Sequence, residues 1–281
     1  MSRWLIATVL ALGASIALAD EAPKTDPTMD EFRKLPWIKG PTEAKIGDKA
    51  TLKITKEYGF LDAAGTSKFL QLQGNPPSDN AYALVPREGS WFAVFSFSPD
   101  GYVKDDEKID ADALLKSMRE GEKKANESRK QQGRTQMYLD GWEVPPHYDS
   151  TTKRLEWGKR LHDEQQRPFV NYTVRLLGRS GVMSAILVDE PSHLSADVET
   201  FRQVLEGYDY VSGERYAEFR SGDKVAKYGL AALIAGGAAA AAVKTGAAKG
   251  LFKLIALGAA ALFGAVATFF KKLRGRQTPT A

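Results

Sequence analysis

The longest uncharged run in the chain covers residues 254–270 and is followed at once by basic residues. Extended back to Gly250, it reaches about the 20 residues that a helix needs to cross a bilayer core about 30 Å thick. A helix also satisfies its backbone hydrogen bonds within one segment, as the bilayer interior requires. We therefore expect a transmembrane helix over residues 250–270 and a basic cytoplasmic tail over residues 271–281.

The chain begins with a pattern typical of export. Residues 1–19 have the three parts of a secretory signal peptide: Arg3, an apolar stretch too short to span comfortably, and the small residues Ala17-Leu18-Ala19 before Asp20. An uncleaved N-terminal anchor is the alternative interpretation. Residues 20–41 are polar, contain proline and lack an apolar period, which predicts a flexible arm.

Residues 228–243 form another uncharged run, in which eight residues are alanine and three are glycine. Because these residues add little to the free energy of membrane insertion, the run predicts a helix that lies at the interface or packs on the transmembrane helix. Whether it also spans the membrane stays open. Small residues recur at every fourth position in both segments, a spacing that favours close helix packing, including self-association of two copies.

Between the arm and this run, the pattern of residues 42–222 predicts a globular domain. Asp62 and Asp110 are suited to cap two helices. The second helix is charged all round after Gly121, so its second half is expected to project into solvent. Three short strands are expected from alternation or from aromatic and β-branched content, over residues 50–55, 82–85 and 91–98.

The second half of the domain predicts an antiparallel meander. Gly178-Arg179-Ser180-Gly181 predicts a tight turn with Gly178 or Gly181 at positive φ. A following helix, capped by Ser195, carries an apolar stripe that needs a sheet to pack on. The fold class is therefore α+β, an antiparallel sheet with packed helices, and the order of elements is similar to a PsbP-like α/β/α sandwich. Four strands with short connections make up the meander: residues 135–142, 153–161, 169–177 and 182–189.

The positive charge of the chain belongs to its C-terminal end. The formal net charge is +4, and residues 228–281 hold seven basic residues and no acidic ones. The exported part, residues 20–227, has 31 basic and 35 acidic residues, which argues against nucleic acid as a partner. Cysteine is absent, which excludes disulfides, thiolate metal sites and a cysteine nucleophile, and fits a bacterial envelope.

The sequence lacks the motifs of the common catalytic, metal and cofactor sites. The histidines His147, His162 and His193 have no metal-ligand spacing. No Gly-x-Ser-x-Gly elbow frames Ser180 or Ser184, and neither a P-loop nor a dinucleotide fingerprint occurs. We therefore expect no metal and no cofactor, and the sequence favours a non-enzymatic protein.

The most distinctive stretch of the domain lies around Trp142 and Tyr148, which flank two prolines. Aromatic faces beside prolines are typical of grooves for a sugar or an extended peptide. Trp142 and Trp157 equally suit the end of a sheet. Asp105 and Asp106 add clustered carboxylates, for which a solvated helix start is the alternative interpretation. The candidate binding residues are therefore Trp142, Tyr148, Asp105 and Asp106.

Short motifs spaced through the domain carry a family resemblance. They are found at residues 101–106, 141–142, 146–149, 155–157, 171–172, 177–181 and 226–230. Their order resembles the bacterial membrane-anchored family called domain of unknown function 2167. The resemblance covers roughly residues 47–272 and implies an envelope protein with a C-terminal membrane segment. It implies no catalytic residues.

Together these features predict a single-pass protein of the bacterial inner membrane, with its body in the periplasm and its C-terminus in the cytoplasm. Its expected partners are the lipid bilayer and an envelope protein or cell-wall component, which it binds or scaffolds without catalysis. One alternative is an envelope hydrolase that uses Asp105, Asp106 and Asp149 near the Trp142–Tyr148 groove. The other is a membrane-integrity or stress factor that acts through its apolar C-terminal segments.

Overall fold

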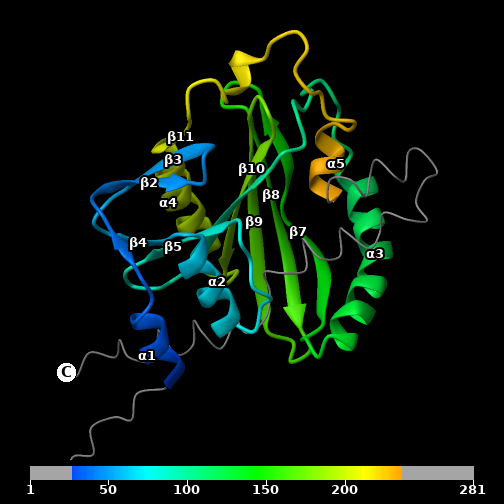
Figure 1. Ribbon diagram of the computed structural model, residues 1–281. Helices are drawn as coiled ribbons and strands as arrows, with labels where there is room; N and C mark the ends of the chain where they lie inside the picture. Colours follow the sequence, from blue (N-terminus) through cyan, green and yellow to red (C-terminus); the bar gives the residue numbers. More distant parts are fainter. Residues whose placement is uncertain (1–26, 236–281) are drawn as a thin grey trace, which may run out of the picture.

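The computed structural model describes residues 27–235, which fold around an eight-stranded antiparallel sheet of order β1-β4-β5-β6-β10-β9-β8-β7 (Figure 1). A second, three-stranded sheet has the order β11-β3-β2. The large sheet contains β1 (Ile38–Lys39), β4 (Tyr58–Leu61), β5 (Ala81–Pro86), β6 (Phe92–Ser98), β7 (Met137–Asp149), β8 (Arg154–Asp163), β9 (Pro168–Leu177) and β10 (Val182–Asp189). The small sheet contains β2 (Thr42–Ile46), β3 (Ala50–Ile54) and β11 (Tyr208–Tyr210).

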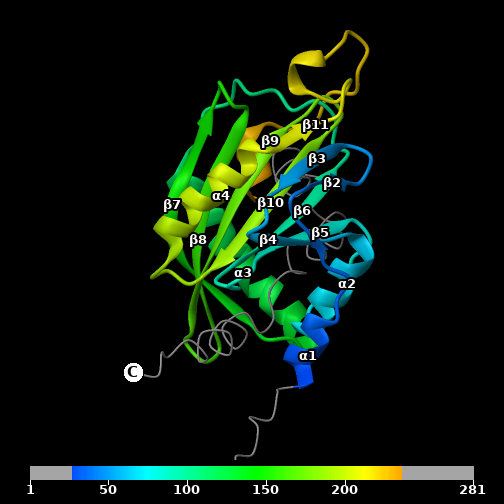
Figure 2. The same cartoon turned by 90° about the vertical axis from the view of Figure 1, so that its left-hand side faces the viewer.

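Helices lie on both faces of the large sheet (Figures 1 and 2). The helix α4 and the small sheet cover one face, and α2, α3 and α5 lie on the other. This arrangement confirms the α+β class with an antiparallel sheet and packed helices. The helices are α1 (Pro27–Arg33), α2 (Ala63–Leu72), α3 (Ala111–Gln131), α4 (Leu194–Glu206) and α5 (Leu230–Ala235), with a 3-10 turn, η1 (Tyr216–Glu218).

Several predicted segments lie outside the described residues. They are the signal peptide, residues 20–26 of the arm, residues 236–243 of the alanine-rich run, the transmembrane helix over 250–270 and the tail over 271–281. Within residues 27–235, no helix combines the length and the apolar character needed to cross a membrane. The predicted topology therefore stays a prediction.

The strands β7 to β10 confirm the predicted meander, because each pairs antiparallel with the next through a short connection. β7 runs beyond the predicted strand as far as Asp149. Register shifts between Val144 and His147 place the two prolines in an irregular part of the ladder. Proline cannot donate a ladder hydrogen bond, so such an irregularity lets an edge strand continue past it.

Both predicted N-caps of the earlier helices are confirmed. Asp62 Oδ1 accepts a hydrogen bond from Gly65 N at 2.8 Å, and Asp110 Oδ1 accepts one from Ala113 N at 3.0 Å. The cap predicted for the last helix is wrong. α4 begins with His193 as its N-cap, without a side-chain hydrogen bond, because the turn after β10 already directs the backbone into the helix.

The second half of α3 does not project into solvent, contrary to the prediction. It packs along the edge strand β7 through polar side chains. The Asn126 amide donates to Met137 O at 2.8 Å and accepts from Met137 N at 2.9 Å, and Glu122 accepts from Leu139 N. An edge strand presents unpaired backbone N–H and C=O groups. A polar helix face can satisfy them, so a charged pattern here indicates contact with a sheet edge.

Part of the predicted flexible arm packs on the domain. Phe32 of α1 and the following Leu35 are buried. Phe32 and Trp37 lie edge-on to Phe69 of α2, with ring centroids 5.4 Å and 6.2 Å away, and β1 then pairs with β4. These apolar residues are too few and too irregular to form a periodic pattern, so the sequence indicated an arm.

Gly178 and Gly181 close the β9–β10 turn with a hydrogen bond from Gly178 N to Gly181 O of 2.9 Å, which confirms the tight turn. Neither residue has a positive φ, so that part of the prediction is wrong. Glycine is needed for space instead. A Cβ atom on Gly181 would lie 2.1 Å from Ser98 O of β6, and one on Gly178 would lie 2.6 Å from the Tyr210 ring.

Candidate functional site

Two of the four predicted binding residues meet in the structure. The Tyr148 hydroxyl donates to Asp105 Oδ2 at 2.7 Å, and Lys153 Nζ donates to the same oxygen at 2.8 Å. Burial alone would raise the pKa of Asp105, but the hydrogen bonds from Lys153 and Tyr148 outweigh it and lower that pKa. Burial and the bond to Asp105 raise the pKa of Tyr148. Asp105 is thus a paired, ionised carboxylate at neutral pH.

The other predicted residues lie apart from this contact. Trp142 Nε1 donates to Ala111 O at 3.0 Å at the start of α3, and its ring packs on the core beneath that helix. Asp106 is exposed. Asp149, the third carboxylate of the hydrolase alternative, is also exposed and accepts from Thr152 Oγ1 at 2.7 Å in the β7–β8 turn. That bond is the main reason why the pKa of Asp149 is lowered.

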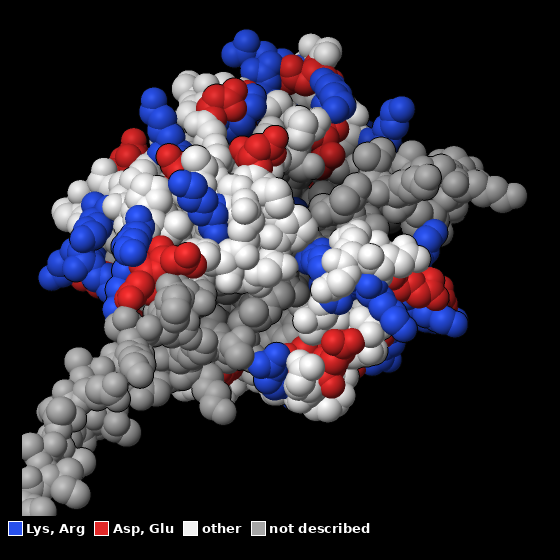
Figure 3. All heavy atoms as spheres, turned by 60° about the horizontal axis from the view of Figure 1, so that its bottom comes forward, with Lys and Arg blue, Asp and Glu red and all other residues white. Residues whose placement is uncertain are grey.

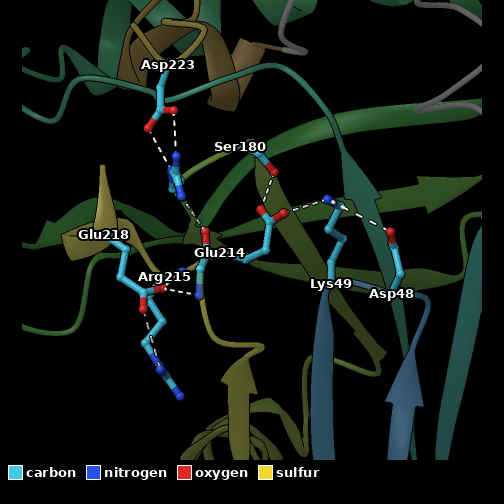
Figure 4. Close-up of polar contacts among 9 residues, drawn as sticks. Asp48, Lys49, Ser180, Glu214, Arg215, Glu218 and Asp223 are labelled. Atoms are coloured by element: carbon cyan, nitrogen blue, oxygen red, sulfur yellow. Dashed lines mark hydrogen bonds and ion pairs between the residues drawn. The ribbon is translucent and has the colours of Figure 1, made fainter. Parts of the chain in front are cut away.

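A polar network fastens the end of the sheet near these residues (Figure 4). Arg179 of the β9–β10 turn forms two hydrogen bonds of 2.7 Å with Asp223, and this contact lowers the pKa of Asp223 to about 2. Glu214 accepts from Lys49 Nζ at 2.7 Å and from the Ser180 hydroxyl. The network ties the β2–β3 turn and the β9–β10 turn to the segment that leads to α5.

This network is suited to hold the segments together and poorly suited to catalysis. Burial would raise the pKa of Glu214, but the hydrogen bonds from Lys49 and Ser180 outweigh it and lower the pKa. A carboxylate held in this way is a weak base for activating the Ser180 hydroxyl. Within residues 27–235, no group of three or more histidine and carboxylate side chains is arranged to hold a metal ion.

A second candidate site lies on the face of the large sheet between α2 and α3. Residues directly opposite each other in antiparallel strands point to the same face. Phe92 at one end of such a row contacts Phe69 of α2, and Trp142 at the other end contacts α3, so the row runs from one helix to the other. The row consists of Phe92, Val188, Asn171, Lys159 and Trp142, on β6, β10, β9, β8 and β7.

The two following rows continue this face. One consists of Val94, Ile186, Thr173 and Trp157, and the other of Ser96, Ser184, Arg175, Leu155 and Tyr148. The predicted residues Trp142 and Tyr148 therefore lie at the β7 edge of one sheet face. We call its polar centre the donor-rich face, defined by Trp157, Lys159, Asn171, Thr173, Arg175 and Ser184.

Polar atoms of the donor-rich face are buried without a hydrogen-bond partner. Asn171 is 1 % exposed and Ser184 is 2 % exposed, and the Asn171 amide and the Ser184 hydroxyl have no partner. Trp157 Nε1 and Arg175 Nε are buried and unpartnered as well. Buried polar groups of folded proteins nearly always have a partner, and leaving one without costs about 1–3 kcal/mol. These polar atoms could therefore form hydrogen bonds with a group that lies outside residues 27–235, such as a bound ligand.

The donor-rich face is also cationic. Burial, followed by repulsion from Arg175 and from Arg129 of α3, lowers the pKa of Lys159 to about 8. Burial likewise lowers the pKa of Arg175, while Tyr228 and Asp100 act in the opposite direction. No carboxylate is among the groups that shift the pKa of Lys159 in the described part of the chain. On the surface seen in Figure 3, by contrast, acidic and basic side chains lie interspersed.

On the opposite face of the sheet, the buried charge of Glu156 is paired within the domain. Glu156 is 6 % exposed and accepts a hydrogen bond from Arg202 of α4 at 2.9 Å and another from the Tyr172 hydroxyl. His147 Nε2 lies 3.6 Å from the same carboxylate oxygen. A buried charge needs a counter-ion and hydrogen bonds. Glu156 has both within the domain, whereas no carboxylate contributes to the pKa shift of Lys159 among the described residues.

Comparison with known proteins places the chain in a family. The model of the family described as "Protein of unknown function (DUF2167)" matches residues 38–268, which is more than half of the chain. The chain belongs to this family. No protein of curated function matches this DUF2167 protein.

Two solved structures are similar to the DUF2167 protein at a low level. One is the solution structure of cyanobacterial PsbP from Synechocystis sp. PCC 6803, with a TM-score of 0.34 and 12 % identity over 59 % of this chain and 89 % of that one. The other is the crystal structure of the Saccharomyces cerevisiae Ran-binding protein Mog1p, with a TM-score of 0.34 and 9 % identity over 65 % of this chain and 100 % of that one. At these TM-scores the likeness carries no argument, so a PsbP-like sandwich stays a prediction.

Sequence reasoning missed the donor-rich face of the DUF2167 protein as a site. Asn171, Thr173 and Arg175 alternate with apolar residues of β9, and such a pattern is typical of a strand with one face in solvent. The pattern does not reveal that Asn171 and Thr173 are buried, because burial depends on elements far away in the chain. The sequence predicts for Trp157 a place at the end of a sheet, and Asn171 belongs to a family motif that implies no role.

Proposed function

We propose that this DUF2167 protein is a membrane-anchored domain of the bacterial envelope that binds a ligand on its donor-rich face without catalysis. The observation that carries the proposal is the set of buried polar atoms of Trp157, Asn171, Arg175 and Ser184 that have no partner. A binding site holds polar groups ready for its ligand, and binding then recovers the free energy lost by their desolvation. The partner would be an envelope or cell-wall component.

The hydrolase alternative has less support. A general acid needs a raised pKa, so that it is protonated near neutral pH. Asp105 and Asp149 have lowered pKa values, because each accepts hydrogen bonds from neighbouring side chains. Their contacts are with the β7–β8 turn and the loop before α3, where they stabilise local structure.

Purification of the full-length protein from its own membranes tests the binding function. Native mass spectrometry of the protein in mild detergent should show a bound molecule that is released on unfolding. The variant Asn171→Leu with Ser184→Ala replaces buried polar groups of the face and should lose this mass. A matched control, Ser212→Ala at an exposed position, should keep it. A wild-type protein with the mass of the bare chain would contradict the proposal.

We also propose that one transmembrane helix, residues 250–270, displays the domain in the periplasm. The packing of α5 supports a single span. Leu230, Leu233 and Ile234 are buried in a core cluster shared with Leu114 of α3. Strong apolar side chains at the start of the alanine-rich run thus contact the domain. The rest of the run has too little apolar content to favour insertion into a membrane. The small-residue repeats stay a prediction of close helix packing.

Cysteine labelling tests this topology, because the chain has no native cysteine. Ser212 is exposed on the domain, and Ser212→Cys should react with a membrane-impermeant maleimide in intact spheroplasts. Thr278→Cys in the basic tail should react only after the membrane is permeabilised. Labelling of Thr278→Cys in sealed cells would instead favour a hairpin with two spans.

A further inference from the structure

We infer that the ligand of the donor-rich face carries an oxyanion, a carboxylate or a phosphate, held between Lys159 and Arg175. The inference rests on the proposed function and specifies the chemistry of the ligand. It depends on three properties of the face: the convergence of two cations, the shortage of acidic groups around them, and the surplus of hydrogen-bond donors.

The two cations converge although their backbones are separated. Lys159 lies opposite Asn171, and Arg175 is four residues further along β9, about 13 Å at the rise of a β-strand. The Arg175 guanidinium leans over the indole of Trp157, with its carbon 5.9 Å from the ring centroid. Trp157 is the neighbour of Lys159 on this face of β8. The Arg175 charge also lowers the pKa of Lys159, so the two cations are near enough to repel each other.

The elements packed around this area bring mostly positive charge. Arg129 of α3 lowers the pKa of Lys159. The pKa of Arg129 is itself lowered by burial and by Arg134, which follows the helix. Asp100, before α3, is an acidic residue that raises the pKa of Arg175, against the larger lowering by burial. Asp100 also acts on Tyr228, whose pKa is raised by burial and then by Asp100. Among the described residues, no carboxylate contributes to the pKa shift of Lys159.

The neutral groups of the face favour the same ligand class. Trp157 Nε1 donates only, and the Asn171 amide and the Ser184 hydroxyl donate as well as accept. An oxyanion accepts several hydrogen bonds at once, and bonds to a charged partner are about twice as strong as neutral ones. A cationic or apolar ligand would leave Lys159 and Arg175, which are both partly buried, without a counter-charge.

Lys159 gives the binding a defined pH dependence. Its pKa is about 8 in the ligand-free face, and an anion beside it favours the protonated amine. Below pH 8 the amine is already charged, so Lys159 adds no pH dependence to the affinity. Above pH 8 binding requires uptake of a proton, and affinity should fall by about tenfold per pH unit. Arg175 keeps its charge throughout this range.

Equilibrium binding to the full-length protein in detergent tests the inference. The protein is first washed at pH 10 to release bound anions, and inorganic phosphate or succinate is then titrated in at constant ionic strength against chloride. Isothermal calorimetry should detect one of the two anions at pH 7, and which of them binds distinguishes the phosphate from the carboxylate source. Lys159→Met should weaken that binding by about tenfold or more, because one charge-assisted contact is lost.

Lys159→Arg provides the matched control for charge. It should bind the anion at pH 7 and keep its affinity up to pH 10, whereas the wild type should lose affinity above pH 8. Binding that does not depend on residue 159, or no binding of either anion beyond chloride, would overturn the inference. If a neutral molecule nevertheless co-purifies with the wild type, the proposed binding function stands and only the ligand chemistry is wrong.

Discussion

Replacing Lys159 by methionine is expected to stabilise the ligand-free protein at pH 7, by about 2 kcal/mol. The folded protein holds this lysine with a pKa of about 8, against 10.5 for an ordinary lysine. Each unit of such a shift corresponds to about 1.4 kcal/mol, and the effect is smaller than the full shift implies because the side chain is only partly buried and solvent screens its charge. Methionine has a similar length and no charge to desolvate.

The pH dependence of the free energy of unfolding gives a second measurement of the same shifted pKa. Between pH 8 and pH 10.5 the unfolded chain binds a proton at Lys159 that the folded chain does not bind. The free energy of unfolding should therefore rise with pH across this window in the wild type, and the Lys159→Met variant should lack this rise. Chemical denaturation in detergent at several pH values measures both.

A matched control separates this effect from a general loss of surface charge. Lys123 is exposed on α3, and Lys123→Met should change stability by less than about 0.5 kcal/mol. If Lys159→Met instead destabilises the protein as the loss of a salt bridge would, the amine has a counter-ion within the protein and the donor-rich face is not a site.

Replacing Gly181 by valine is expected to destabilise the domain by about 3 kcal/mol, the upper part of the usual range for overpacking. The first side-chain carbon would lie 2.1 Å from Ser98 O and 2.6 Å from the Phe97 ring. Since Ser98 is paired with Val182 next to the turn, the end of the β6–β10 ladder must open to admit it. The midpoint of denaturant unfolding should fall accordingly.

Gly121→Ala is the control for this substitution. Gly121 lies in the interior of α3, and a Cβ atom there meets nothing within 4 Å. Alanine is a better helix former than glycine by about 1 kcal/mol, so this variant should be slightly more stable than the wild type. An unchanged midpoint for Gly181→Val would show that the turn is less tightly packed than the structure indicates.

Local chemistry explains which parts of the fold were predictable. Asp62 and Asp110 cap their helices through contacts with residues three positions away, so the relevant information is in the adjacent sequence. The meander from β7 to β10 was predictable for the same reason, because short connections leave antiparallel pairing as the simple solution. Ser195 failed as a cap because the turn before α4 starts the helix earlier.

Long-range packing explains the remaining differences. The polar half of α3 contacts β7 through Asn126, and the need of an edge strand for such partners is not visible in the helix pattern. A positive φ was expected at Gly178 or Gly181, whereas the approach of Ser98 of β6 is what requires glycine at position 181. The donor-rich face went unrecognised because the burial of Asn171 becomes evident only when the helices are placed on the sheet.

An experimental structure of the full-length protein, purified from its own membranes without denaturation, would show whether the donor-rich face holds an anionic ligand. We expect density from a molecule other than the protein on the donor-rich face, with an anionic group in hydrogen-bonding contact with Lys159 Nζ and the Arg175 guanidinium. If the density on this face comes from protein residues alone, and Lys159 and Arg175 are bonded to the chain itself, the proposed anion site is wrong.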